Sequence, residues 1–152
     1  MRFKYEQQIE LPREIVWKFH ENPEHLVMLH EGWGGFRMIC HDGCVSRGCR
    51  TWCEAIAFGI LPVAMGFEHD LYEPPLRFGE KMIHGPFETF RHIHEFEEGS
   101  GGTIVRDLLE IELPWYYGGE LGMKLLIRPI LEQTFRNRRK ALLKLAESGK
   151  IG

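Results

Sequence analysis

Apolar residues recur at spacings of three and four from Glu120 to about Glu147, which is the period of an amphipathic helix. A helix of this length needs a long apolar surface on which to lie. Between Phe36 and Leu113 apolar and polar residues instead alternate, and Gly or Pro turns separate the segments, which predicts antiparallel strands. We therefore expect one curved antiparallel sheet to carry the helix. Pro129, inside the helical pattern, predicts a kink or a boundary there.

The chain begins with a strand and two short helices. Phe3 to Leu11 alternates as a half-buried strand does, and Pro12 suits the first position of a helix that ends before Pro23. A second helix follows, with three apolar residues expected to face inward: Leu26, Val27 and Leu29. After a loop at 32–35, six strands are expected: 36–40, 49–58, 63–73, 77–84, 86–97 and 103–113. This order predicts an α+β protein in which the long helix packs on an antiparallel sheet.

Composition excludes several classes of protein. The 152 residues suffice for one domain, 1–152, and the net charge of -3 gives no basic field, so we expect no nucleic-acid partner. No apolar run reaches the roughly 18 residues that cross a bilayer, so we expect no stable membrane insertion. The charged N-terminus is unlike a secretory signal. These absences favour the cytoplasm, where cysteines stay reduced.

The four cysteines have a spacing that permits zinc binding but does not diagnose it: Cys40, Cys44, Cys49 and Cys53. Cys49 and Cys53 would lie four residues apart on one strand, about 13 Å at the rise of a strand, which is too far for two ligands of one zinc ion. We interpret the four as reduced thiols that pack as small apolar side chains. Whether they have a role beyond packing stays open.

The strand within Gly85 to Gly102 carries the most unusual side chains of the sequence. Its alternation places two phenylalanines and two histidines on one face, a better lining for a pocket than for a core: Phe90, His92, His94 and Phe96. If this strand pairs with 103–113, Asp107 lies beside the histidines and can orient an imidazole. Three roles stay open for this group, namely satisfied buried polar contacts, orientation of a ligand, and acid–base catalysis.

His92, His94 and Asp107 are also a set that can bind a transition metal, with His69 as a further ligand. We nevertheless expect no metal and no cofactor, because such a geometry is seldom met by accident. The sequence has no phosphate loop, nucleophile elbow or dinucleotide fingerprint. Basic residues crowd the last helical turns and are expected to form a solvated face, with a lipid headgroup as the sharper alternative: Arg136, Arg138, Arg139, Lys140 and Lys144.

The block GPFETFRHIHEFEEGSGGTIVRDLLEIELP, Gly85 to Pro114, resembles a pattern of an uncharacterised bacterial subgroup of the SRPBCC, or START-like helix-grip, superfamily. That superfamily includes lipid-transfer domains, birch-pollen-allergen-like proteins and polyketide cyclases. Leu11-Pro12 with Ile15-Val16-Trp17 resembles the subgroup's first helix, and Phe135-x-x-Arg138 resembles its last. The segment Cys40 to Cys53 departs from the pattern, as does Phe90, where tryptophan is common.

The resemblance implies a curved seven-stranded antiparallel sheet wrapped around a long C-terminal helix, with a cavity between them. It implies binding or transport of a hydrophobic or amphipathic small molecule, lipid- or polyketide-like. The alternative is a cyclase or dehydratase with His92 or His94 and Asp107 as its acid–base group, although a binding protein is favoured over an enzyme. A homodimer is left open. The expected lining residues are Gln7, Met65, Phe67, His69, Phe90, His92, His94, Asp107 and Phe135.

Overall fold

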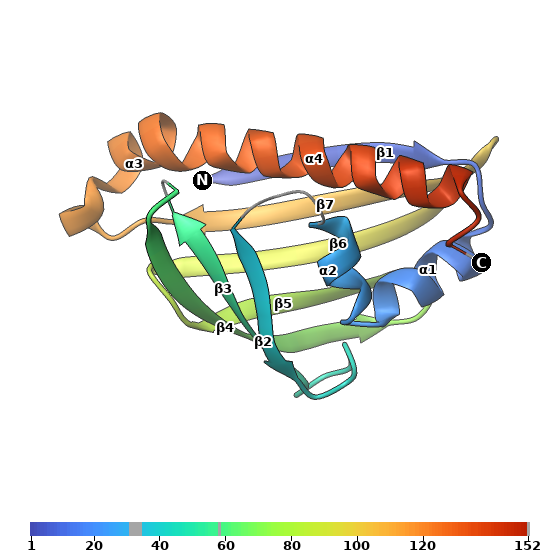
Figure 1. Cartoon of the computed structure of the whole chain (residues 1–152), viewed down its shortest axis with the longest axis horizontal. Coiled ribbons are helices and arrows are strands. Elements are labelled where there is room, and N and C mark those ends of the chain that lie inside the picture. The colour runs from blue at the N-terminus through green and yellow to red at the C-terminus, as the bar shows by residue number, and fades with distance from the viewer. Residues whose placement is uncertain (31–34, 58, 152) are drawn as a thin grey trace.

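The computed structural model describes residues 1–30, 35–57 and 59–151 (Figure 1). The predicted loop at 32–35 and the predicted strand end at Phe58 fall largely outside these residues. The elements follow one another as β1 (Arg2–Ile9), α1 (Arg13–Glu21), α2 (His25–Leu29), β2 (Phe36–His41), β3 (Arg50–Ala57), β4 (Leu61–Glu73), β5 (Arg77–His84), β6 (Thr89–Gly99), β7 (Gly102–Glu112), a 3-10 turn (Trp115–Tyr117), α3 (Gly119–Gly122), a π-helical turn (Met123–Ile127) and α4 (Arg128–Glu147). The α+β order predicted from the sequence is confirmed.

The seven strands form one antiparallel sheet in the order β1-β7-β6-β5-β4-β3-β2. Figure 1 shows the sheet curving beneath α4, which runs along β1 and β7, while α1 and α2 lie against the same face. α4 packs against β1 and α2, and α1 packs against β6 and β7. The long helix therefore lies on the sheet, as its apolar stripe requires.

Prolines set the ends of the helices as expected. Pro12 is the N-cap of α1, and α1 ends at Glu21, just before the Asn22-Pro23 pair. Pro129 occupies the first turn of α4 and follows the π-helical turn, so the predicted boundary is confirmed. Two residues of the apolar patterns are not buried. Val27, which was expected to face inward, is exposed, and so is Ile130, one of the apolar residues that recur along the long helix.

The core consists of two apolar clusters with a polar strip between them. Trp17 of α1 meets the rings of Phe78 and Phe96 edge-on, at centroid distances of 5.6 and 5.4 Å, in a cluster that includes Val105. The second cluster gathers Leu109, Ile111, Leu113, Met123 and Phe135. On β7, Asp107 lies between Val105 of the first cluster and Leu109 of the second. The fold thus encloses a carboxylate between two apolar clusters.

The cysteines correct the prediction of four reduced thiols. Cys44 and Cys49 form a disulfide, while Cys40 is free and exposed and Cys53 is free and buried. Cys49 precedes β3 rather than lying in it, because the segment after β2 folds back and brings the two Cα atoms to 5.9 Å. With two of the four sulfurs joined, a four-cysteine zinc site is excluded. The interpretation of packed apolar thiols holds for Cys53 alone.

Reducing the disulfide is expected to lower the free energy of unfolding by about 2 kcal/mol, because a bond across a five-residue separation restricts the unfolded chain only modestly. Urea denaturation with and without dithiothreitol measures the change. The Cys44→Ser variant should lose the response to the reductant, whereas Cys40→Ser should keep it. An identical urea midpoint for oxidised and reduced protein would contradict this expectation.

Candidate functional site

The β6–β7 hairpin places the histidines and Asp107 on the concave face. Its ladder closes with Gly99 opposite Gly102 and pairs His94 directly with Asp107. Gly102 has a φ of 131°, and a side chain there would collide with the carbonyl oxygen of Ile9, so only glycine fits. The predicted proximity of Asp107 to the histidine face is confirmed.

Asp107 is shared by the two imidazoles. Its Oδ1 atom accepts a hydrogen bond from His92 Nε2 at 2.9 Å. His94 Nδ1 also lies 2.9 Å from that oxygen, but its direction does not satisfy a hydrogen bond, and this buried nitrogen has no hydrogen-bond partner among the described residues. The rings of His92 and His94 are 4.0 Å apart, and His94 stacks on Phe78. Both imidazoles are therefore packed closely against neighbouring groups in the interior.

Glu80 completes the cluster from β5, although it was not predicted as a site residue. It is the register partner of His92. Its Oε1 lies 3.8 Å from His92 Nδ1, and its Oε2 lies 3.7 Å from His69 Nε2. The sequence already indicates this position, because Glu80 is two residues from both Phe78 and Met82 and therefore lies on the same face of the strand as they do.

Arg138 reaches the cluster from α4. One of its guanidinium nitrogens lies 3.9 Å from Asp107 Oδ1, and its guanidinium lies 5.2 Å from the centre of the Phe135 ring. The expectation that Arg138 belongs to a solvated basic face is wrong, since its side chain is only 12% exposed. The reason is helical periodicity, which puts Arg138 on the same inward stripe as Phe135 and Leu142.

Burial and charge act against each other on the pKa values of this cluster. Burial favours the protonated carboxyl of Asp107, but Arg138 and the imidazoles outweigh it and hold its pKa well below the usual range. Burial is likewise outweighed at Glu80, where the neighbouring histidines lower the pKa to about 2. The two carboxylates overcome the burial of His92 and raise its pKa. Burial, aided by the charge of His92, lowers the pKa of His94 to about 3.

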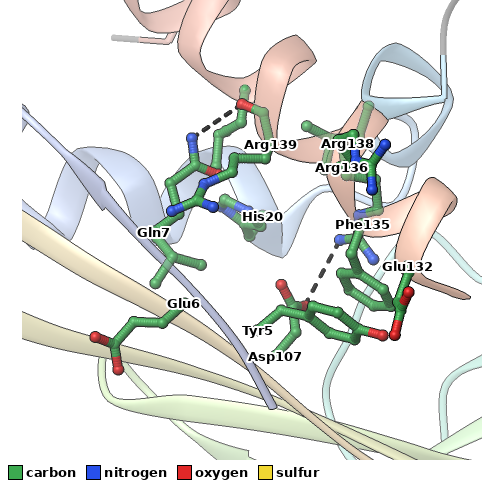
Figure 2. A pocket seen from close by; sticks show the side chains of 13 residues that line it. Tyr5, Glu6, Gln7, His20, Asp107, Glu132, Phe135, Arg136, Arg138 and Arg139 are labelled. Carbon is green, nitrogen blue, oxygen red and sulfur yellow. Dashed lines mark hydrogen bonds and ion pairs between the residues drawn. The ribbon is translucent and has the colours of Figure 1, made fainter. Parts of the chain in front are cut away.

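A cavity of about 280 Å³ opens beside the cluster, between α4 and the β1–β7 edge of the sheet (Figure 2). Its apolar walls are Tyr5, Leu29, Val105, Phe135 and Leu142. Tyr5 and Phe135 stack with their ring centres 4.1 Å apart. The Tyr5 hydroxyl oxygen is buried and has no hydrogen-bond partner among the described residues. The cavity therefore offers aromatic surface, and one residue of its wall carries a buried polar atom that lacks a partner in the described part of the chain.

Charged groups form the rest of the wall. Figure 2 shows Arg138 directed at Asp107 and Gln7 bonded to the backbone of Arg139. Gln7 Nε2 donates to the carbonyl oxygen of Arg139 at 2.9 Å, which ties β1 to α4 at the cavity wall. His20 of α1 also lines the cavity, and burial lowers its pKa to about 4. The lining is amphipathic rather than uniformly apolar.

Three of the nine predicted lining residues line this cavity: Gln7, Asp107 and Phe135. Three further predicted residues are buried: His69, His92 and His94. Of these, His92 and His94 contact Asp107, which faces the cavity. Phe67 and Phe90 contact each other at a ring distance of 5.4 Å, and Met65 lies half-buried on β4. Apart from Val105 on β7, the lining residues that were not predicted lie on β1 or a helix: Tyr5, Glu6, His20, Leu29, Glu132, Arg136, Arg138, Arg139 and Leu142.

Comparison with known proteins relates this geometry to a class of fold. No protein-family description matches the sequence, and no curated protein is detectably related to it. Solved structures do match. The protein TTHA0849 from Thermus thermophilus superposes with a TM-score of 0.73 at 19% identity, covering 98% of this chain and 99% of that one. The protein Ms6760 from Mycobacterium smegmatis gives 0.74 at 12% identity, covering 97% and 92%.

A third match specifies the fold more closely. Ara h 8.0201 superposes with a TM-score of 0.69 at 11% identity, and the match covers 97% of this chain and 98% of that chain. The protein thus has the helix-grip fold defined by a curved sheet and a long C-terminal helix. Within that class it has the Bet v1-like arrangement of strand, two short helices, six strands and helix. Among the described residues, no helix is long and apolar enough to cross a membrane.

Proposed function

We propose that this chain, residues 1–152, is a START-like domain that binds a small amphipathic molecule in the cavity under α4. The observation that carries the proposal is the buried hydroxyl of Tyr5, which has no hydrogen-bond partner in the described part of the chain and belongs to a wall of stacked aromatic rings. An apolar body would cover Phe135 and Leu142, and a polar end would hydrogen-bond Tyr5. A volume of about 280 Å³ lies just under the usual range of ligand pockets, so a compact molecule fits better than a long-chain lipid.

Binding is supported over catalysis by the position of the imidazoles. The alternative enzyme would be a polyketide cyclase or dehydratase that uses His92 or His94 with Asp107. Among the described residues, neither His92 nor His94 is part of the cavity wall, and Asp107 alone of the three faces it. Asp107 is held ionised by its neighbours and is a weak base, since its pKa is well below the usual range.

A cytoplasmic location and a homodimer remain expectations. The Cys44–Cys49 disulfide bears on the first of them, because disulfides persist mainly in oxidising compartments. Cysteine labelling of protein taken directly from its host, before and after reduction, would decide whether the bond exists there.

Binding is tested with an amphipathic probe, 1-anilinonaphthalene-8-sulfonate, by fluorescence titration and calorimetry. We expect one saturable site. Gln7→Trp places a large ring in the cavity wall and should weaken binding at least about tenfold, because it fills the volume and removes the bond to Arg139. The matched control is Gln8→Trp, at the neighbouring position on the outer face of β1, which should bind as the unaltered protein does.

Two results would count against the proposal. One is the absence of saturable probe binding to folded protein, and the other is equal binding by Gln7→Trp and Gln8→Trp. Urea midpoints of both variants should be measured alongside, so that loss of the folded state is not mistaken for loss of the site.

A further inference from the structure

We propose that Glu80, His92 and His94 together bind one divalent transition-metal ion, zinc in the first instance, on the concave face of the sheet. This inference does not depend on the proposed ligand cavity, because the three side chains lie behind Asp107 rather than in the cavity wall. It revises the expectation of no metal, which was formed without Glu80.

The strands bring the three ligands together. Glu80 on β5 is the register partner of His92 on β6, and His94 follows two residues later on the same face. One ligand atom from each lies within 4.8 Å of the others. Ligands of a tetrahedral zinc ion lie roughly 3.4 Å apart at bond lengths near 2 Å. Closing around an ion therefore requires side-chain movements of about 1 Å, with no change of backbone.

Asp107 orients His92 for this role. His92 Nε2 donates its proton to Asp107 Oδ1 at 2.9 Å, which leaves the lone pair of Nδ1 on the side of Glu80. Nδ1 and Glu80 Oε1 are 3.8 Å apart, too long for a hydrogen bond but close to the spacing of two ligands on one ion. A carboxylate behind a metal-binding imidazole is a common arrangement, because it fixes the tautomer and strengthens the ligand.

Two buried imidazoles of this region each carry one nitrogen without a hydrogen-bond partner among the described residues. His94 Nδ1 and His69 Nδ1 are buried and lack hydrogen-bond partners among the described residues. Both side chains are more than nine-tenths buried. Buried polar atoms without partners are rare, and each calls for an explanation. Binding an ion through Nδ1 would give the His94 nitrogen such a partner. His69 faces Glu80 with its other nitrogen, Nε2, 3.7 Å from Glu80 Oε2, and is placed to supply a fourth ligand from there, which does not account for its own Nδ1.

The local charge favours a cation. Glu80 and Asp107 place two carboxylates in the interior. Within the described residues, the arginine or lysine that pairs with either of them is Arg138, 3.9 Å from Asp107. Burying an uncompensated charge is costly, so a further positive charge is expected beside Glu80. Protonation of His92 is the alternative to a metal ion as the source of this positive charge. Two imidazoles and one carboxylate are the ligand set of known zinc sites with an open fourth position.

The experiment uses the full chain without a histidine tag, stripped with a chelator, and carrying Cys40→Ser to remove the exposed thiol. Calorimetric titration with zinc chloride should show one equivalent bound, and the thermal midpoint should rise with zinc. Glu80→Gln should weaken zinc binding at least about tenfold, because it replaces an anionic ligand with a neutral amide. The matched control is His84→Ala, an exposed position on the same strand, which should leave affinity unchanged.

A cobalt titration of the same Cys40→Ser chain, with Glu80 intact, keeps the proposal testable if Glu80→Gln fails to fold. Visible d–d bands without a thiolate charge-transfer band are expected from nitrogen and oxygen ligands. A thiolate band would assign the ion to cysteine and overturn the proposal. A lack of saturable zinc or cobalt binding would also overturn the proposal and would leave a protonated His92 as the positive charge beside Glu80. Equal zinc affinity of Glu80→Gln and the protein with Glu80 intact would overturn it as well.

Discussion

Replacing Asp107 with Asn is expected to lower the free energy of unfolding by about 3–5 kcal/mol, because it removes one partner of a buried ionic cluster. Asp107 is the carboxylate that both His92 and Arg138 face, at 2.9 and 3.9 Å. An amide of the same shape leaves the guanidinium of Arg138 buried without its counter-charge. Urea denaturation at neutral pH measures the loss.

The control for this substitution is Glu110→Gln on the same strand. Glu110 pairs with Arg2 on the outer face, where the side chains are 43% and 84% exposed. Exposed ion pairs contribute less than about 1 kcal/mol, so this variant should differ little from the unaltered protein. If Asp107→Asn also cost less than about 1 kcal/mol, the interior around Asp107 would have to be hydrated, contrary to its burial.

Acid is expected to destabilise the protein in two stages. The pKa of His20 is lowered to about 4 by burial, so the folded state resists a proton that the unfolded state accepts near pH 6.5. Stability present above pH 6.5 is therefore lost as the pH falls from about 6.5 to 4, with a slope of up to about 1.4 kcal/mol per pH unit for this one group. The pKa of Glu80, at about 2, is also depressed, so its contribution is lost below about pH 4.5.

His92 acts in the opposite direction. Its pKa is raised, so its contribution is complete below the unfolded value of about 6.5 and is lost as the pH rises through the folded pKa. We therefore expect maximal stability near neutral pH. Urea midpoints at a series of pH values check this. His20→Leu should reduce the slope of the upper stage, and part of it should remain because the pKa of His94 is also lowered, to about 3. Glu80→Gln should likewise reduce the lower stage, to which Asp107 also contributes. A midpoint that is constant between pH 7 and 4 would refute the scheme.

The fold could be predicted because its signals are local. Alternation marks the strands, and Pro12, Pro23 and Pro129 lie at helix ends in the structure as they do in the sequence pattern. The pairing of Cys44 with Cys49 could not be predicted in this way. The pairing depends on a loop that turns back on itself. The spacing of the cysteines in the sequence does not indicate how close this loop brings their Cα atoms.

The contacts of the site were predictable where the partners lie close together in the sequence. His94 and Asp107 belong to one hairpin, so parity alone places them together. Arg138 comes from α4, and its approach depends on how that helix is rotated over the sheet, which the basic run around it concealed. The stacking of Tyr5 on Phe135 joins the two ends of the chain. No local pattern indicates that contact.

The glycine turn between β6 and β7 determines which side of the sheet carries the buried charge. Side chains alternate faces, so one residue added between Gly99 and Gly102 would shift the ladder and present Arg106 inward with Asp107 in solvent. Two added residues would preserve the parity. The glycine-specific backbone at Gly102, pressed against Ile9, leaves little room for either change. The length of this turn, as much as the identity of the charged residues, thus encodes the polarity of the interior.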